Sequence, residues 1–195
     1  RFDARRGGAE TYAVRLARSL TLAGHPVEVF CRRSGSELSG VTVHELHLTG
    51  GRAWRITEFA RACEEANADA ITPVNTFVGM AVDVYKRRPM LSNVTGGLSG
   101  PAIRPLALRL VYQAVQAVSI PVIGIGGIST ARDALEFLIA GAVAIQIGTA
   151  NFFDPMAPVK VVEGLENYCR EQNIDSIRDI IGTLAVLRDG EYVYY

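Results

Sequence analysis

The feature of the chain that most constrains its fold is a rhythm of strand, loop and helix that repeats through the second half. The apolar runs at 121–124 and 142–147 are short and almost uninterrupted, and each is followed by glycine and, further on, by a helical pattern. Apolar strands that alternate with helices are typical of a parallel sheet covered on both faces. The sequence therefore predicts an α/β fold with a mainly parallel sheet.

Apolar spacing and capping residues predict the other elements. The predicted strands are too few to close an eight-stranded barrel, so we expect an open or half-closed sheet whose exposed edge favours self-association. A long loop is expected at 75–101, with a short strand of its own near 90–93. Helices are expected at 9–24, 56–66, 103–118, 131–141, 159–170 and 176–181, and further strands at 26–31, 41–48 and 70–74.

Composition and charge exclude several classes of function. The 20 Lys and Arg residues balance 20 Asp and Glu residues, so neither nucleic acid nor an anionic membrane is expected as a partner. No apolar run approaches the length of a membrane span, and the first six residues are too polar for a signal peptide. The three cysteines lack metal-ligand spacing and are expected to be reduced thiols. We therefore expect a cytoplasmic protein without a metal site.

Two glycine-bearing strand ends lie one strand–helix unit apart, at 124–129 (GIGGIS) and at 148–149 (GT). Glycine lets backbone N–H groups approach an anion without a Cβ in the way, and a following helix directs its positive end to the same place. Paired strand ends of this kind form the phosphate site that (βα)8 barrels place after their last two strands. The pair favours a phosphate site, although the same glycines would also suit simple tight turns.

Asn75 and Thr76 directly follow the predicted strand at 70–74. An amide and a hydroxyl at the carboxyl end of a barrel strand can bind a planar polar ring through several hydrogen bonds. The same dipeptide would also suit an Asx-type turn. Taken alone the pair slightly favours the turn, so a substrate-binding role depends on the motifs around it.

Those motifs share their order and spacing with one enzyme family. They resemble the C-terminal half of dihydroorotate dehydrogenases over residues 65–182, particularly class 1 cytosolic enzymes whose catalytic subunit works with an iron–sulfur flavoprotein subunit. GGLSGPAI is the most specific string. The motifs are VNT at 74–76, GM at 79–80, NVTGGLSGPAI at 93–103, GIGGIS at 124–129 and GTANF at 148–152.

The resemblance implies a partial (βα)8 barrel of the TIM type over residues 65–195, with FMN as cofactor and orotate or dihydroorotate as ligand. It implies that Asn75 and Thr76 bind the orotate ring, whereas Ser99 would either line the site or only cap its loop. By position in the motifs, the residues implied to contact FMN or to hold its phosphate are Val74, Gly100, Gly126, Gly127, Gly148 and Thr149.

The implied activity is that of an oxidoreductase which converts dihydroorotate to orotate in pyrimidine biosynthesis, with a base removing a proton while hydride passes to FMN. In class 1 enzymes this base is a cysteine from the N-terminal half of the barrel, and no catalytic residue can be assigned here. Neither Cys31 nor Cys63 stands in such a motif, and both are expected to pack in the core. We therefore expect the isolated chain to be inactive. The alternative is a non-catalytic half barrel that binds FMN or phosphate.

The front of the chain carries a different pattern. GGAET at 7–11, the helical pattern after it and a strand at 27–30 resemble the start of a family 4 glycosyltransferase of the GT-B fold, over about residues 1–63. The resemblance implies a partial Rossmann-like βα segment at 1–64, joined to the barrel near Glu64. No nucleotide-binding domain follows it, so a glycosyltransferase remnant is a weaker alternative. A natural rearrangement, a deliberate recombination or an assembly error would each explain the join.

Overall fold

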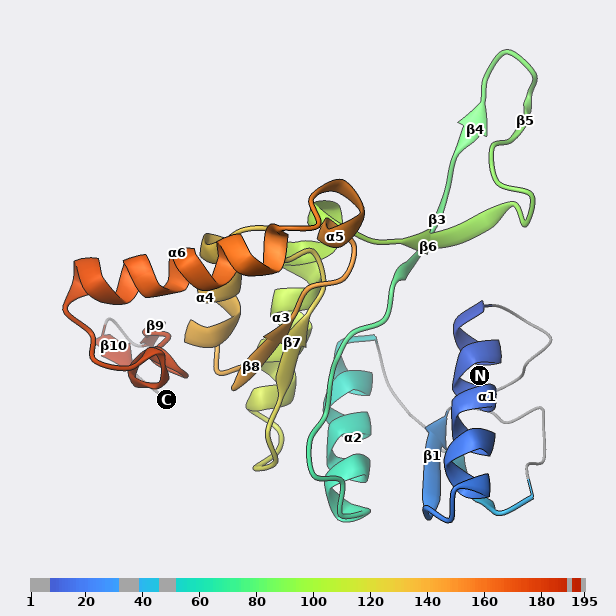
Figure 1. Cartoon of the computed structure of the whole chain (residues 1–195), viewed down its shortest axis with the longest axis horizontal. Helices are drawn as coiled ribbons and strands as arrows, with labels where there is room; N and C mark the ends of the chain where they lie inside the picture. Colours follow the sequence, from blue (N-terminus) through green and yellow to red (C-terminus); the bar gives the residue numbers. More distant parts are fainter. Residues whose placement is uncertain (1–7, 32–38, 46–51, 189–190, 194–195) are drawn as a thin grey trace. The chain divides into compact units, whose positions relative to one another are not determined.

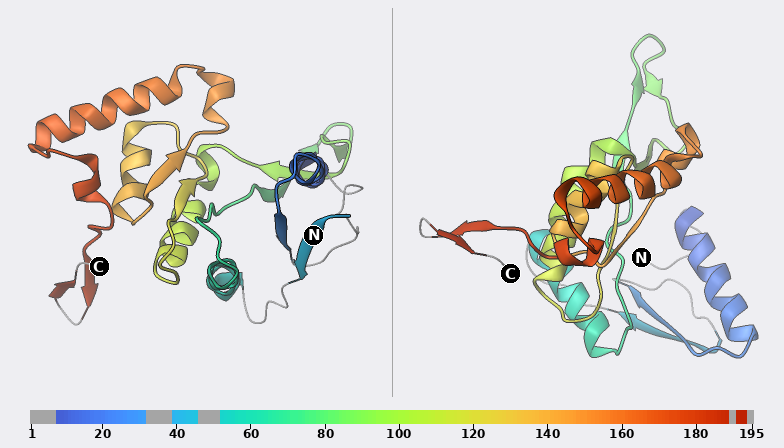
Figure 2. Two further views of the ribbon diagram at one scale, coloured as in Figure 1. Left: turned by 60° about the horizontal axis from the view of Figure 1, so that its bottom comes forward. Right: turned by 60° about the vertical axis from the view of Figure 1, so that its left-hand side comes forward.

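The chain divides into two compact units, residues 1–66 and residues 67–195, and each has its own architecture (Figures 1 and 2). Gly7, the loop residues 32–38 and the predicted strand residues 46–48 lie outside the residues that the structure describes. The described residues of the computed structural model are 8–31, 39–45, 52–188 and 191–193.

The first unit contains a helix, two parallel strands and a second helix. α1 (Gly8–Leu22) is followed by Gly24, whose φ of +86° favours glycine, and β1 (Val27–Cys31) pairs in parallel with β2 (Val41–Glu45). α2 (Arg52–Glu65) completes the unit. Helical spacing on α1 and alternation on the strands bring apolar side chains together, as the predicted Rossmann-like βα segment requires. The residues of this core are Val14, Ala17, Val27, Val29, Val41 and Val43.

The second unit is built on two parallel strands. β7 (Ile123–Ile125) pairs in parallel with β8 (Ala144–Gln146), with Ile123 opposite Ala144. Ile71 adds one parallel bridge to Val122, on the strand side away from β8. Parallel neighbours end at the same edge of a sheet, so the loops that follow β7 and β8 meet there.

Three helices pack around this strand pair (Figure 1). α3 (Arg104–Val115) contacts β7 and α4 (Ala131–Ile139), and α4 contacts α6 (Ala157–Gln172). Phe137 of α4 is fully buried, and a Cβ built on Gly124 of β7 would lie 2.7 Å from its Cδ1. Helix and strand approach closely at this point because the strand carries glycine. Burying such an aromatic side chain contributes about 1.5–3 kcal/mol.

Residues 77–98 form a two-stranded arm, so the prediction of a loop is wrong for this stretch. β3 (Phe77–Met80) pairs antiparallel with β6 (Thr95–Leu98), and beyond them β4 (Val82–Asp83) pairs with β5 (Arg88–Pro89). Figure 1 shows the arm in green, extending away from the helices of its unit. The sequence pattern did not predict β3 and β6, because both contain glycine, which has a low strand propensity.

Two other predictions differ from the structure, and several short elements were not predicted. The strand predicted at 70–74 is reduced to the single bridge at Ile71, because Pro73 has no N–H to donate to a ladder. The helix predicted at 176–181 is a 3-10 turn, η2 (Ile177–Ile180). Short elements that the pattern did not reveal are η1 (Pro101–Ile103), α5 (Ala150–Phe153), and the antiparallel pair β9 (Val186–Arg188) and β10 (Glu191–Val193).

The predicted fold class is confirmed as α/β with parallel strand pairs in both units. Antiparallel pairing among the described residues is confined to the arm and to β9 with β10. The strands of the described residues do not close into a barrel. In the same residues, no helix has both the length and the apolar character needed to cross a membrane.

Candidate functional site

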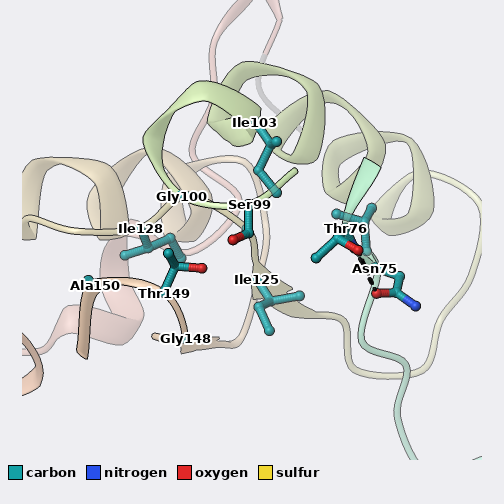
Figure 3. Close-up of a pocket in the computed structure, with 13 residues that line it drawn as sticks. Asn75, Thr76, Ser99, Gly100, Ile103, Ile125, Ile128, Gly148, Thr149 and Ala150 are labelled. Carbon is teal, nitrogen blue, oxygen red and sulfur yellow. Dashed lines mark hydrogen bonds between the residues drawn. The ribbon is translucent and has the colours of Figure 1, made fainter. Parts of the chain in front are cut away.

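A pocket at the carboxyl ends of β7 and β8 gathers the residues that the sequence motifs single out (Figure 3). Its volume is about 80 Å³, well below the roughly 300–1,000 Å³ of typical small-molecule sites, so it would hold one part of a ligand. Every predicted site residue lies in its lining. The lining residues are Val74, Asn75, Thr76, Ser99, Gly100, Ile103, Ile125, Gly126, Gly127, Ile128, Gly148, Thr149 and Ala150.

The turn after β7 needs its two glycines for the packing of the protein itself. Gly126 has φ +119° and Gly127 has φ +79°, values that residues with a Cβ rarely adopt. A Cβ on Gly126 would lie 2.6 Å from the Cβ of Ala107. A Cβ on Gly127 would lie 2.8 Å from the backbone N of Arg104 and from the carbonyl O of Gly100. The tight-turn interpretation therefore accounts for both glycines.

Gly148, after the end of β8, differs from these two. A Cβ built on it would meet no protein atom within 4 Å, and its φ lies outside the left-handed region. Neither packing nor backbone conformation requires glycine here. A ligand that approaches the backbone closely would require it, because a side chain would stand in its path. Among the glycines of the pocket, Gly148 therefore gives the strongest support for ligand binding.

Two hydroxyl groups face the same space. Figure 3 shows the oxygens of Ser99 and Thr149 directed toward each other across the pocket. Within the described part of the chain, neither hydroxyl has a hydrogen-bond partner. No charged side chain lines the pocket, so an anion there would depend on hydroxyl and backbone N–H donors. Ser99, for which the sequence left two roles open, thus lines the pocket.

Asn75 and Thr76 contribute the amide and hydroxyl groups on the other side of the pocket (Figure 3). The Thr76 backbone N–H donates to Oδ1 of Asn75 at 2.7 Å, and its hydroxyl donates to the same oxygen at 3.4 Å. An Asx turn would instead link Oδ1 to the N–H two residues on, so this bond does not form one. Both side chains are exposed and remain available to a ligand.

The first turn of α4 is closed by a carboxylate of the protein. Asp133 accepts hydrogen bonds from the backbone N–H groups of Ser129 at 3.0 Å and Thr130 at 2.9 Å. The Thr130 hydroxyl accepts from the Asp133 N–H at 3.2 Å, which completes a capping box. The buried Asp133 also pairs with Arg104 of α3. The positive end of α4, which we expected to face an anion, is thus already compensated by a carboxylate.

The sequence pattern did not reveal the pairing of Asp133 with Arg104, although the spacing of Thr130 and Asp133 is a capping-box signal. Arg104 gave no local signal, because its partner belongs to another helix. Arg104 also lies 3.6 Å from Glu136, so two acidic side chains of α4 hold the start of α3. The cluster fixes the two turns that contribute Gly100 and Gly127 to the pocket, since those turns contact each other at the Arg104 backbone.

Comparison with known protein families assigns the chain to one of them. The family described as dihydroorotate dehydrogenase matches residues 53–169, which is more than half of the chain. This chain belongs to the dihydroorotate dehydrogenase family. The match begins at residue 53, in α2. The resemblance predicted from the sequence began later, at about Glu65.

The chain is similar to catalytic subunits named dihydroorotate dehydrogenase B (NAD(+)). It is 58% identical over 129 residues to the subunit of Geotalea uraniireducens, which corresponds to 66% of this chain and 42% of the relative. It is 55% identical over 131 residues to the subunit of Porphyromonas gingivalis, or 67% of this chain and 43% of the relative. The chain therefore spans less than half the length of the curated relatives that it matches.

A solved dihydroorotate dehydrogenase structure, DHODH from Eimeria tenella in complex with ferulenol, is also similar. The TM-score is 0.57 at 25% sequence identity, over 73% of this chain and 37% of that chain. The ligand-free enzyme from the same organism has the same TM-score. This likeness supports the predicted partial-barrel architecture. The resemblance of the front segment to family 4 glycosyltransferases and the join near Glu64 stay predictions.

The pocket of this dihydroorotate dehydrogenase segment is lined by no Cys, His, Asp, Glu or Lys side chain that could act as a base. Cys63 of α2 is buried within the first unit. Burial raises the pKa of the Cys63 thiol, which disfavours the thiolate that proton abstraction would need. The side chain of Cys31 lies outside the described structure. Over the described residues, no group of three His, Cys, Asp or Glu residues could hold a metal ion.

Proposed function

We propose that this chain is the FMN- and substrate-binding C-terminal part of a dihydroorotate dehydrogenase B catalytic subunit. The observation that carries the proposal is the convergence of four separate motif segments on one pocket at the strand ends. The whole protein would oxidise dihydroorotate to orotate for pyrimidine biosynthesis, in the cytoplasm. The names of its relatives support that activity.

The chemistry of the pocket fits the phosphate end of FMN. Gly148 leaves its backbone open to a ligand, and the free hydroxyls of Ser99 and Thr149 can both donate to phosphate oxygens. The volume of about 80 Å³ is small for a whole mononucleotide and suits its phosphate end. In this proposal Gly126 and Gly127 add backbone N–H groups from the other turn.

The remaining pocket residues would serve the flavin ring and the substrate. When bound, FMN supplies the acceptor for hydride from dihydroorotate. Val74 and Gly100 would contact FMN. Asn75 and Thr76 would orient the orotate ring, because an amide N–H2 and a hydroxyl can match its carbonyl and ring N–H groups.

A second function is supported by a specific observation. No base lines the pocket, and the thiol of Cys63 is buried, so this segment alone fits a module that binds FMN or phosphate without turnover. Loss of a positioned base typically lowers the rate by about 10²–10⁴-fold. Only the dehydrogenase implies an electron-transferring partner for the whole subunit, and an iron–sulfur flavoprotein is the candidate.

The test is a titration of the purified chain with FMN and with riboflavin, followed by quenching of flavin fluorescence. Hydrogen bonds to a charged group contribute about 1.5–3 kcal/mol, so FMN should bind roughly 10- to 100-fold more tightly than riboflavin. Gly148→Val should abolish this preference, because its side chain would occupy the path of the phosphate. Ala81→Val, at an exposed position on the arm, is the matched control and should leave the preference intact.

Equal affinity for the two flavins would refute the phosphate site. Dihydroorotate-dependent reduction of an electron acceptor by the same sample then separates the two functions. Turnover that requires bound FMN supports the dehydrogenase. FMN binding with no turnover above background supports the binding module.

A further inference from the structure

Asn151, in the first turn of α5, holds the backbone that follows β8. Its side-chain amide donates to the carbonyl O of Ile147 at 2.8 Å and to that of Gly148 at 3.0 Å. Its backbone N–H also donates to the Gly148 carbonyl at 3.1 Å. The carbonyls of Ile147 and Gly148, two of the three between β8 and α5, are thus held on the side of Asn151, which does not itself line the pocket.

Because the peptide unit is planar, the direction of each hydrogen-bonded carbonyl also fixes the direction of the N–H group in the same peptide. In a trans peptide the C=O and N–H groups point in opposite directions. The Ile147 carbonyl shares its peptide plane with the Gly148 N–H, and the Gly148 carbonyl shares its plane with the Thr149 N–H. Asn151 therefore directs the N–H groups of Gly148 and Thr149 to the opposite side, and both residues line the pocket.

A second observation indicates a ligand at these donors. Neither the Gly148 N–H nor the Thr149 N–H has an acceptor among the described residues, although almost all backbone N–H groups in proteins have one. Two successive free N–H groups that point the same way form a concavity suited to an anion. The open space at the Cα of Gly148 leaves room for it.

We propose that Asn151 is a positioning residue for the phosphate of the bound flavin, acting through the Gly148 and Thr149 peptides. This inference rests on the proposed function, since it names how one side of that site is oriented. Both hydrogens of the Asn151 amide are used, one for each carbonyl. An aspartate of nearly the same shape has no hydrogen to donate and would face two carbonyl oxygens with a carboxylate.

The experiment compares FMN and riboflavin affinities in the parent chain, Asn151→Ala and Asn151→Asp. Losing the two orienting bonds should weaken FMN binding by roughly tenfold or more and leave riboflavin binding unchanged. Inorganic phosphate should compete with FMN in the parent chain and compete less well in both variants. Asn167→Asp, an exposed site on α6 with the same change of charge, is the matched control and should behave like the parent.

The outcomes separate this inference from the function on which it rests. A parent chain that binds FMN no better than riboflavin refutes the phosphate site itself. A parent chain that prefers FMN, with an equal preference in both Asn151 variants, overturns only the role of Asn151. If FMN and riboflavin binding are weakened equally in the variants, the role of Asn151 is also overturned. A general loss of structure would weaken the binding of both flavins, with or without the phosphate. Circular dichroism of the two variants checks that the unit stays folded.

Discussion

Replacing Gly127 by alanine tests whether the turn after β7 is as tightly packed as the structure indicates. The residue has φ +79°, and a new Cβ would lie 2.8 Å from three atoms, the backbone N and Cβ of Arg104 and the carbonyl O of Gly100. Two of these are backbone atoms, one at the start of α3 and one just before η1, so they cannot move aside as the end of a flexible side chain can. The variant must therefore distort the turn or displace the start of α3.

Two contributions set the size of the effect. The left-handed backbone conformation costs a residue with a Cβ about 1–2 kcal/mol, and overpacking by one methyl group costs about 1–3 kcal/mol. Alanine has a smaller conformational entropy than glycine in the unfolded chain, which offsets about 0.4–1 kcal/mol of this destabilisation. We expect Gly127→Ala to lower the free energy of unfolding of the second unit by about 1–4.6 kcal/mol.

Amide hydrogen exchange in α4 under increasing urea is a suitable assay, because it reports on the second unit alone. Fluorescence would not, since the single tryptophan, Trp54, belongs to the first unit. Gly148→Ala is the matched control. Its Cβ would meet no atom within 4 Å, so its stability should stay within about 0.5 kcal/mol of the parent. A change of less than about 0.5 kcal/mol in Gly127→Ala would show that the turn is not constrained as described.

Three further predictions concern stability, association and pH. Phe137→Ala should cost about 3–5 kcal/mol in urea unfolding because the ring is fully buried, whereas Phe153→Ala, 77% exposed, should change stability little; equal effects would refute the described core. The apolar arm should make the chain self-associate at micromolar concentration, and Tyr85→Ser, at a residue 95% exposed, should shift sedimentation toward monomer; a parent chain that is already monomeric contradicts this. The hydrogen bond from Lys160 lowers the pKa of Asp154, so this carboxylate stabilises the fold above its ordinary pKa and loses that contribution as pH falls through the lowered value. Asp154→Asn should therefore reduce the fall of the unfolding midpoint at acid pH. An unchanged dependence of the midpoint on acid pH would contradict this prediction.

The residues that the sequence motifs single out lie together in one pocket, because the main signals of these motifs are local. Gly126 and Gly148 each follow a short apolar strand, and parallel strands that are neighbours must end at the same edge of a sheet. Asn75 and Thr76 reach the pocket although the strand predicted before them is only a single bridge. Their position depends on the direction of the chain at Ile71 rather than on a full ladder.

What the sequence did not reveal depends on partners that are far apart in the chain. The arm is a ladder between β3 and β6, whose glycines and shortness leave no alternating pattern for either strand alone. The link between Arg104 and Asp133 joins two helices, and neither helix indicates the other. Asn151 looked like part of a family motif, and only the hydrogen bonds to the carbonyls of Ile147 and Gly148 give it a physical role.

Every residue that lines the pocket falls between Val74 and Ala150, inside the second unit. A site contained in one continuous stretch passes intact through any recombination whose breakpoints lie outside that stretch. Such a segment would bring its affinity for phosphate into each new protein that it joins, even when the residues that perform the chemistry stay behind. Ligand binding can then be inherited without catalysis. A new reaction can evolve in a protein that already binds the cofactor.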